Sequence, residues 1–183
     1  MLLKMANNIK QIKAIVLDVD GVLTDGKMIY SDSGESKVFY VRDGKGINLA
    51  QVAGLRIAIM TSENSLIIKR RAEKLKIEDA YLGIMNKLRS IKEFCSKYKL
   101  NLEEVAFVGD DINDIPALEV VGLPIAVNDA VEEVKNEVKK RGGIISKNNG
   151  GNGAVREIIE KILKEMGKWE ETVRKDIERQ KSE

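Results

Sequence analysis

The sequence predicts an α/β fold with a doubly wound, mostly parallel sheet and a small β-hairpin insertion. Short apolar runs at residues 14–17, 55–60, 105–108 and 123–127 are typical of strands buried on both faces of a parallel sheet. Stretches with apolar residues spaced by three or four alternate with these runs, as helices do in such folds. Acidic or hydroxyl side chains directly follow several of the runs, where ligands bind in open α/β sheets.

The first half of the chain predicts a hairpin and then two strand–helix units. Apolar and polar residues alternate over 27–30 and 36–41, which indicates two hairpin strands joined by a turn over 31–34. A short helix over 47–53 should follow and end at Gly54. The next expected elements are a strand over 55–60, a helix over 64–75, a strand over 80–82 and a helix over 86–98.

The second half repeats the alternation. The strand over 105–108 ends in an acidic turn, and Pro116 then falls in the first turn of a helix, where proline is tolerated. A strand over 123–127 precedes a helix over 129–140 that Asp129 is expected to cap. An edge strand over 144–146, a flexible glycine-rich link over 147–153 and a helix over 154–166 complete the pattern.

Length and composition favour one globular domain, which we place at residues 1–166 after a polar lead-in over 1–10. The net charge of +2 gives no argument for binding nucleic acid or an anionic membrane surface. No apolar run approaches the roughly 18 residues that span a bilayer, residues 1–6 do not resemble a signal peptide, and a lone Cys95 forms no internal disulfide. We therefore expect a cytoplasmic protein.

The complete lack of histidine excludes several kinds of site. Ser-His-Asp and Cys-His catalysis and histidine-ligated zinc are all ruled out. Acid–base chemistry would have to use carboxylates, lysine or tyrosine.

Residues 167–183 form a highly charged segment that we expect to be a helical extension of the core. Its apolar residues, among them Trp169, Val173 and Ile177, are spaced by four and continue the pattern of the preceding helix. Two interpretations remain open: an amphipathic extension that frays, or a helix that packs on a neighbouring subunit.

Four polar features follow successive strands, and parallel strands would bring them to one edge of the sheet. They are Asp18 with Asp20, Thr61 with Ser62, Lys87, and the group Asp110, Asp111 and Asp114. Each is unremarkable alone, because acidic turns and strand-end hydroxyls are common. Together they suit phosphoryl transfer, in which carboxylates hold a divalent metal and a hydroxyl and a cation hold the phosphoryl group.

The same residues resemble the motifs of the haloacid dehalogenase superfamily of phosphatases. The segment 18–26 resembles its first motif, Thr61 the second, Lys87 the third and the segment 109–114 the fourth. The resemblance implies that Asp18 is the nucleophile and a Mg²⁺ ligand. Asp20 would be the general acid–base and give its carbonyl to the metal. The remaining implied roles are metal binding by Asp110, support of the metal shell by Asp111, phosphoryl binding by Thr61 and Lys87, and orientation of Lys87 by Asp114.

Four segments resemble one branch of that superfamily more closely, the phosphatases of 3-deoxy-D-manno-octulosonate 8-phosphate (KDO 8-phosphate) and of nine-carbon sialic-acid-type 9-phosphates. They are residues 22–26, 42–46, 70–75 and 150–156. Two positions depart from the KDO 8-phosphate pattern: Glu63 stands where arginine is common, and Asn86 stands where aspartate is usual. Glu63 with Lys74 resembles the nine-carbon members. The residues expected to bind substrate are Thr61, Ser62, Glu63, Arg70, Lys74, Lys87 and Arg156.

Many members of the superfamily carry a cap domain, but here only about 30 residues separate Thr24 from Leu55. Chains under about 40 residues rarely fold alone, so we expect no cap. A neighbouring subunit would then close the site, and the resemblance implies a homotetramer built through the hairpins. Two interpretations of the glycine-rich link remain open. It either carries Arg156 into an adjacent active site or is only a mobile linker.

Three functions are compatible with a doubly wound sheet that carries clustered acids, a threonine and a lysine. The favoured one is a Mg²⁺-dependent phosphomonoesterase that acts on a 2-keto-3-deoxy sugar acid phosphate through an aspartyl-phosphate. One alternative is a catalytically silent assembly module, similar to the domain fused to some acylneuraminate cytidylyltransferases. A signalling receiver domain is disfavoured, because its phosphorylated aspartate lies on a later strand than the first acid pair.

Overall fold

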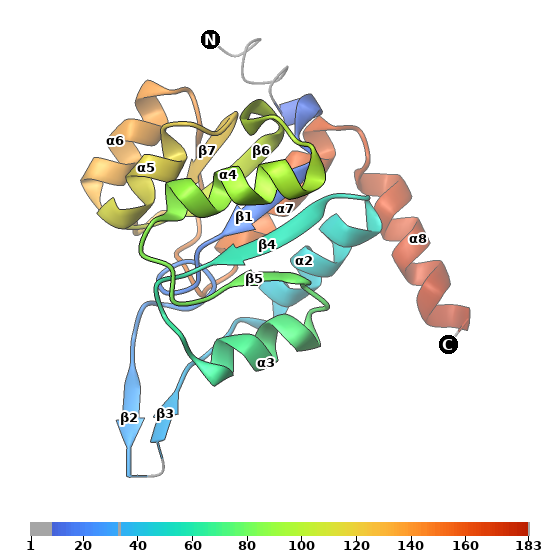
Figure 1. Ribbon diagram of the computed structural model, residues 1–183. Coiled ribbons are helices and arrows are strands. Elements are labelled where there is room, and N and C mark those ends of the chain that lie inside the picture. The colour runs from blue at the N-terminus through green and yellow to red at the C-terminus, as the bar shows by residue number, and fades with distance from the viewer. Residues whose placement is uncertain (1–8, 33, 183) are drawn as a thin grey trace.

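The computed structural model describes residues 9–32 and 34–182, and these form an α/β fold around a parallel sheet (Figure 1). Within these residues the sheet has six strands in the order β5-β4-β1-β6-β7-β8, and every neighbouring pair is parallel. The predicted doubly wound parallel sheet is therefore confirmed. The strands are β1 (Ala14–Leu17), β4 (Arg56–Met60), β5 (Asp79–Tyr81), β6 (Val105–Gly109), β7 (Leu123–Ala126) and β8 (Ile144–Ile145).

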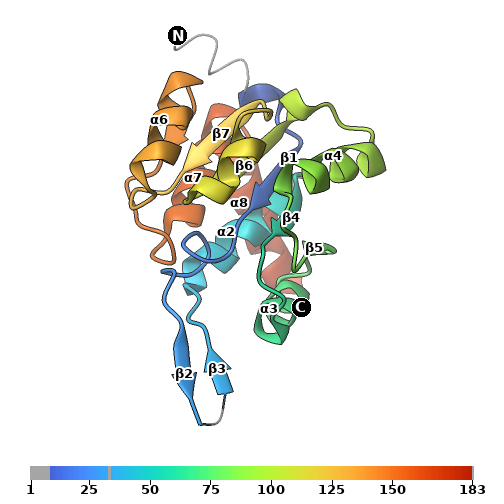
Figure 2. The same cartoon turned by 60° about the vertical axis from the view of Figure 1, so that its left-hand side comes forward.

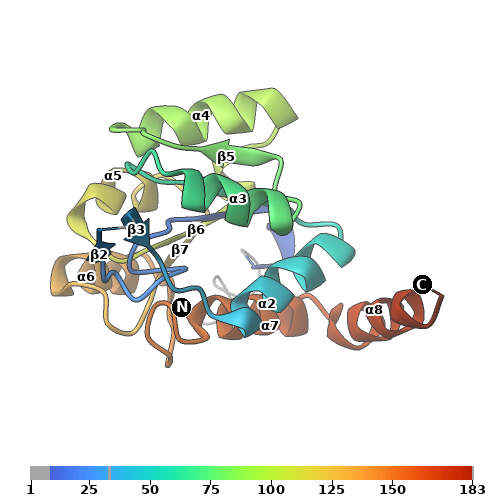
Figure 3. The ribbon, with the colours of Figure 1, turned by 90° about the horizontal axis from the view of Figure 1, so that it is seen from below.

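Helices cover both faces of the sheet, as Figure 3 shows from below. Helix α2 packs closely against α7 on one face, while α4 and α5 lie together on the other. The central strands β1 and β6 are apolar throughout and fully buried because both of their faces are covered. The helices are α2 (Val41–Val52), α3 (Leu66–Lys74), α4 (Lys87–Tyr98), α5 (Ile115–Leu118), α6 (Glu132–Lys140), α7 (Ala154–Glu165) and α8 (Trp169–Ser182), with 3₁₀ turns η1 (Leu102–Glu104) and η2 (Ile112–Asp114).

The strand order creates a switch point beside β1. The chain runs outward from β1 through β4 to β5, and then returns to β6 on the other side of β1. In open α/β sheets, loops that leave neighbouring strands in opposite directions make such a point a ligand-binding crevice. Asp18 and Asp110 follow β1 and β6 at this point.

The hairpin exists but is shorter than predicted. Strands β2 (Ile29–Ser31) and β3 (Gly34–Ser36) are antiparallel and project away from the sheet (Figures 1 and 2). The predicted second strand over 36–41 is wrong, because β3 ends at Ser36 and Val41 already begins α2. Between β1 and β4, the described residues contain this hairpin and α2 and no separately folded cap.

Helix α2 begins at Val41, six residues before the predicted start at 47. Gly44 and Gly46 lie inside this helix, where the low helix propensity of glycine does not favour one. A Cβ at Gly46 would lie 3.0 Å from the Cα of Arg156 on α7. Asp43 is buried and accepts a hydrogen bond from the Arg156 backbone N–H at 2.8 Å. Tertiary contact with α7 thus outweighs the low helix propensity of the glycines.

The segment 147–153 was expected to be a flexible link, and this expectation is wrong. It packs against the loop after β1: Gly151 donates a hydrogen bond to the Val22 carbonyl at 2.9 Å. A Cβ at Gly150 would lie 1.6 Å from the Gly21 carbonyl oxygen, so the glycines permit backbone contact. Asp129 is not the cap of α6, which begins at Glu132, because its carboxylate accepts from the Gly150 N–H at 2.8 Å instead.

The two ends of the chain extend the core differently. The predicted lead-in over 1–10 falls largely outside the described residues, although Ile9 is buried. Helix α8 contacts α2 and α7 and then continues past them (Figure 3). The division into a core domain over 1–166 and an extension over 167–183 stays a prediction. Among the described residues, no helix is long and apolar enough to cross a bilayer.

Candidate active site

Three of the expected site residues lie side by side because of strand register. Leu17 of β1 pairs with Ile59 of β4 on one side and with Val108 of β6 on the other. The residues that follow these strands therefore meet at one edge, and they include Asp18, Thr61 and Asp110. Asp18 and Thr61 are buried, whereas Asp110 is partly exposed.

Lys87 joins two carboxylates at the centre of this edge. Its Nζ atom lies 2.9 Å from Oδ1 of Asp18 and also pairs with Oδ1 of Asp114. All three side chains are almost completely buried. Lys87 is the first residue of α4, and Asn86 caps that helix by accepting from the Arg89 N–H at 2.9 Å. Asparagine therefore serves here as an N-cap in place of aspartate.

Asp114 has partners for both of its oxygens. Oδ1 is held by Lys87, and Oδ2 accepts from the backbone N–H of Asp110 at 2.9 Å and of Asp111 at 3.4 Å. Gly109 makes this possible, since a Cβ there would lie 2.4 Å from Oδ2 of Asp114. The bonds fix the acidic turn and aim Lys87 at Asp18.

Asp18, Asp110 and Asp114 each place a carboxylate oxygen within 4.8 Å of the others. Because the oxygens of Asp114 are already engaged, Asp18 and Asp110 are better placed to hold a cation. The Oδ1 atom of Asp110 is buried and has no hydrogen-bond partner within the described part of the chain. Such an orphaned carboxylate oxygen fits a hard divalent cation such as Mg²⁺, which prefers oxygen ligands.

The pKa values of the two carboxyl groups reflect the same crowding. Burial, followed by the charge of Asp114, raises the pKa of Asp18 to about 7 despite the nearby Lys87. Burial and then the charges of Asp18 and Asp114 raise the pKa of Asp110 to about 8. A cation between them would relieve this repulsion. The loop leaves room for it because Gly21, with φ of +87°, has no side chain to collide with Asp110.

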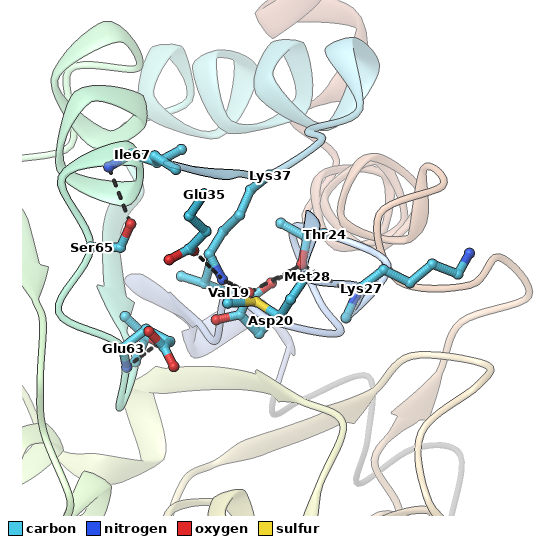
Figure 4. A network of polar contacts seen from close by, with 12 residues as sticks. Val19, Asp20, Thr24, Lys27, Met28, Glu35, Lys37, Glu63, Ser65 and Ile67 are labelled. Atoms are coloured by element: carbon cyan, nitrogen blue, oxygen red, sulfur yellow. Dashed lines mark hydrogen bonds and ion pairs between the residues drawn. The ribbon is translucent and has the colours of Figure 1, made fainter. Parts of the chain in front are cut away.

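Asp20 lies next to Lys37, which follows the hairpin (Figure 4). Its Oδ1 atom lies 2.6 Å from Nζ of Lys37, which also contacts Sδ of Met28 at 3.1 Å. The Thr24 hydroxyl donates to the same oxygen at 3.4 Å. The Oδ2 atom of Asp20 is buried without a partner among the described residues, so it is available to a bound ligand.

Lys37 is a site residue that the sequence analysis missed. It lies 17 positions from Asp20, just past the end of β3, and no motif marks it. The one available signal was a lysine between Ser36 and Val38, inside the segment 36–41 that the sequence predicts as a strand. Figure 4 shows its side chain reaching from the hairpin to Asp20.

The other expected residues on the β4 side are more exposed. Ser62 and Glu63 follow Thr61 and are both exposed, and the Glu63 N–H donates to the Thr61 hydroxyl oxygen at 3.1 Å. Asp111 is exposed as well, and its carboxylate accepts from the Ile112 N–H at 2.7 Å. Its side chain therefore caps η2 and forms a capping box with Asp114.

The structure does not bring Arg70, Lys74 or Arg156 to the acidic cluster. Arg70 and Lys74 are exposed on α3, and neither makes a hydrogen bond or ion pair within the described residues. Arg156 on α7 pairs with Glu160 at 3.4 Å and lies over the Trp169 ring. It lines a separate hollow of about 660 Å³ with Tyr40 and residues of α7.

Comparison with known proteins agrees with this geometry. The sequence profile of the haloacid dehalogenase-like hydrolases matches residues 58–158. The chain is 37% identical to the 3-deoxy-D-manno-octulosonate 8-phosphate phosphatase KdsC of Haemophilus influenzae over 165 residues, which is 90% of this chain and 89% of that protein. The corresponding Escherichia coli K12 enzyme is 38% identical over 163 residues, 88% of this chain and 85% of that protein.

Solved structures give the same result. A HAD superfamily subfamily III A hydrolase from Legionella pneumophila aligns with a TM-score of 0.91 and 34% identity, covering 97% of this chain and 96% of that one. The KDO 8-phosphate phosphatase of Moraxella catarrhalis, solved with magnesium, phosphate and KDO, aligns with a TM-score of 0.89 and 34% identity, covering 96% of this chain and 99% of that one.

Proposed function

Because this chain belongs to the haloacid dehalogenase-like hydrolases, and within them to the KDO 8-phosphate phosphatase family, we propose that it hydrolyses the phosphate monoester of a 2-keto-3-deoxy sugar acid. The observation that carries the proposal is the buried Lys87 between Asp18 and Asp114, next to the orphaned oxygen of Asp110. This arrangement offers a nucleophile, a cation and an open metal position within one crevice. KDO 8-phosphate, the substrate for which the relatives are named, is the first candidate.

In the proposed mechanism, the Asp18 carboxylate attacks phosphorus in line and forms an aspartyl-phosphate. Lys87 and the Thr61 hydroxyl balance the negative charge of the transferring group. Protonated Asp20 gives its proton to the leaving alcohol and, once ionised, accepts one from the water that hydrolyses the aspartyl-phosphate. Mg²⁺, held by Asp18, Asp110 and the Asp20 carbonyl, would supply further neutralisation of phosphate charge. Asp114 would orient Lys87, and Asp111 would support the metal shell.

The substrate-binding assignment rests on the family resemblance. Ser62 and Glu63 follow Thr61 and are exposed, so they would be free to bind the sugar. Arg70 and Lys74 would act from α3. Arg156, which lies apart from the cluster of its own chain, would bind the substrate carboxylate of a neighbouring site.

A second substrate class is favoured by Glu63. Its exposed carboxylate accepts hydrogen bonds, which suits the hydroxyl groups or amine of a nine-carbon ulosonate 9-phosphate better than a bare carboxylate. The arginine common at this position in KDO 8-phosphate phosphatases would favour the carboxylate instead.

The proposed assembly is a homotetramer in the cytoplasm. Several large apolar side chains around the hairpin are exposed, which favours cover by another subunit; they are Ile29, Tyr30, Val38 and Val41. No cap closes the crevice within the described residues, and a neighbouring hairpin would exclude water from it.

The test is phosphate release from a substrate panel. We expect turnover of KDO 8-phosphate or a nine-carbon 9-phosphate, measured by catalytic efficiency with Mg²⁺. The Asp18→Asn variant should lose turnover, EDTA should abolish it reversibly, and the exposed hairpin variant Asp32→Asn should retain it. Substantial turnover by Asp18→Asn would refute the mechanism. No phosphate release from any panel member or aryl phosphate would favour a silent assembly module.

A further inference from the structure

Helix α8 shows an inverted distribution of side chains. The face toward its own domain is polar: Thr172 and Asp176 are buried, and Nζ of Lys45 on α2 lies 2.6 Å from Asp176. The apolar residues lie along another side, where Ile177 is 47% exposed and Val173 is half-buried. A helix that packed only on its own domain would bury Val173 and Ile177 and expose Thr172 and Asp176.

The apolar side of α8 forms a groove that is open to a partner. Trp169, Val173 and Ile177 follow one another at a spacing of four and line a hollow of about 470 Å³, together with Glu170, Arg174, Glu178 and Lys181. Arg156 and Lys164 lie 5.4 Å and 5.6 Å from the centre of the Trp169 ring, so the ring is held in place. A rigid tryptophan beside aliphatic side chains is a common anchor of protein interfaces.

The order of charges along α8 indicates which partner fits. The first turn is acidic, with Glu170 and Glu171, and the last turn is basic, with Arg179 and Lys181. Of these, Glu170 and Lys181 line the groove. A second α8 packed antiparallel in the groove would place Glu170 of each copy near Lys181 of the other, and the two helix dipoles would run in opposite directions, which is favourable. A parallel copy would place like charges together.

We propose that α8 docks antiparallel against α8 of a second copy of this chain, through Trp169, Val173 and Ile177. The pairing is isologous, because a twofold axis brings the same groove of both copies together. Helix α8 projects from the side of the molecule away from the hairpin, so this contact is separate from the proposed hairpin assembly (Figures 1 and 3). It does not depend on the proposed phosphatase activity.

The first experiment measures particle mass in solution by sedimentation. Ile177→Glu should weaken self-association at least tenfold and halve the particle mass, because a buried unpaired charge opposes the contact. The matched control Lys175→Glu changes charge on α8 outside the groove and should retain the mass. Circular dichroism and phosphate release should match the unmodified protein in both variants.

The second experiment tests the antiparallel direction by charge reversal. Glu170→Lys should weaken association, and adding Lys181→Glu should restore it, because both residues line the groove. The two changes together oppose the helix dipole, so a gain in helix stability does not explain the restoration. The proposal is overturned if the unmodified protein shows no α8-dependent association, if Ile177→Glu leaves the mass unchanged, or if the double variant stays dissociated.

Discussion

Nζ of Lys37, beyond β3, lies 2.6 Å from Oδ1 of Asp20, just after β1, and so connects the hairpin to the candidate acid–base residue. Oδ2 of Asp20 has no partner in the described structure. Oδ2 is therefore the oxygen that would exchange the proton. The hairpin therefore has a role inside its own subunit, in addition to any contact with a neighbour.

Lys37→Met should lower kcat by about 10- to 100-fold with little change in KM. General acid–base catalysis raises the rate by about 10²–10⁴-fold, and this gain depends on the position of the Asp20 carboxyl group. Lys27→Met is the matched control, since Lys27 lies in the same segment but pairs with Asp25 in an exposed contact at 2.9 Å. Steady-state phosphate release checks both. Equal kcat in the two variants would show that Lys37 does not position Asp20.

Asp110→Asn should weaken Mg²⁺ binding at least tenfold. The substitution removes a charge from the oxygen-rich site and keeps its size, so the fold should survive. Titration calorimetry with Mg²⁺ measures the change directly, and Asp32→Asn in the exposed turn is the control. Unchanged affinity in Asp110→Asn would place the ion elsewhere.

The free energy of unfolding of the metal-free protein should decrease as the pH rises from about 4 to 8. The pKa values of Asp18 and Asp110 are raised, mainly by burial, from 3.8 to about 7 and about 8. At pH values between 3.8 and these raised pKa values, the folded state binds more protons than the unfolded state, so raising the pH favours unfolding. The Tm without metal should be higher at pH 5 than at pH 8.

Saturating Mg²⁺ should reduce or reverse that slope, because it binds the ionised carboxylates of the folded protein. Asp110→Asn should also flatten the slope in the absence of metal. Thermal unfolding followed by circular dichroism measures each case. A metal-free Tm that rises between pH 5 and pH 8 would contradict the assignment.

Lys87→Met should destabilise the metal-free protein by about 3–5 kcal/mol, because it leaves two buried carboxylates facing each other without a cation. The control Lys140→Met removes an exposed lysine from its pair with Glu137, at 3.2 Å, and should cost less than about 1 kcal/mol. Urea unfolding at pH 7 measures both. A similar loss in the two variants would mean that the buried pairing is not the source of stability.

Gly46→Ala should destabilise the protein by about 1–3 kcal/mol although alanine is the better helix former. The added methyl group would lie 3.0 Å from the backbone of Arg156, so α2 and α7 would have to separate. At Gly44 the nearest atom is the Nη2 end of Arg71, at 2.7 Å, and a flexible side chain can move. Gly44→Ala should therefore cost less in the same urea experiment.

The apolar runs and acidic turns of the sequence were sufficient to predict the parallel sheet and the central cluster. The buried strands β1, β4 and β6 carry continuous apolar runs, and parallel strands necessarily align their carboxyl ends. Asp18, Thr61 and Asp110 meet for that reason, so their proximity could be predicted without knowing the strand order or the packing of the helices.

Features that depend on close approach between distant segments could not be predicted from the sequence. The start of α2, the packed path of residues 147–153 and the contact between Lys37 and Asp20 were each mispredicted or missed. Glycines at 46 and 150 look like local flexibility in a sequence, but here they let two backbones touch. Periodicity records which side chains avoid water, whereas a contact between two particular residues depends on how whole elements pack, and that is fixed only when the chain has folded.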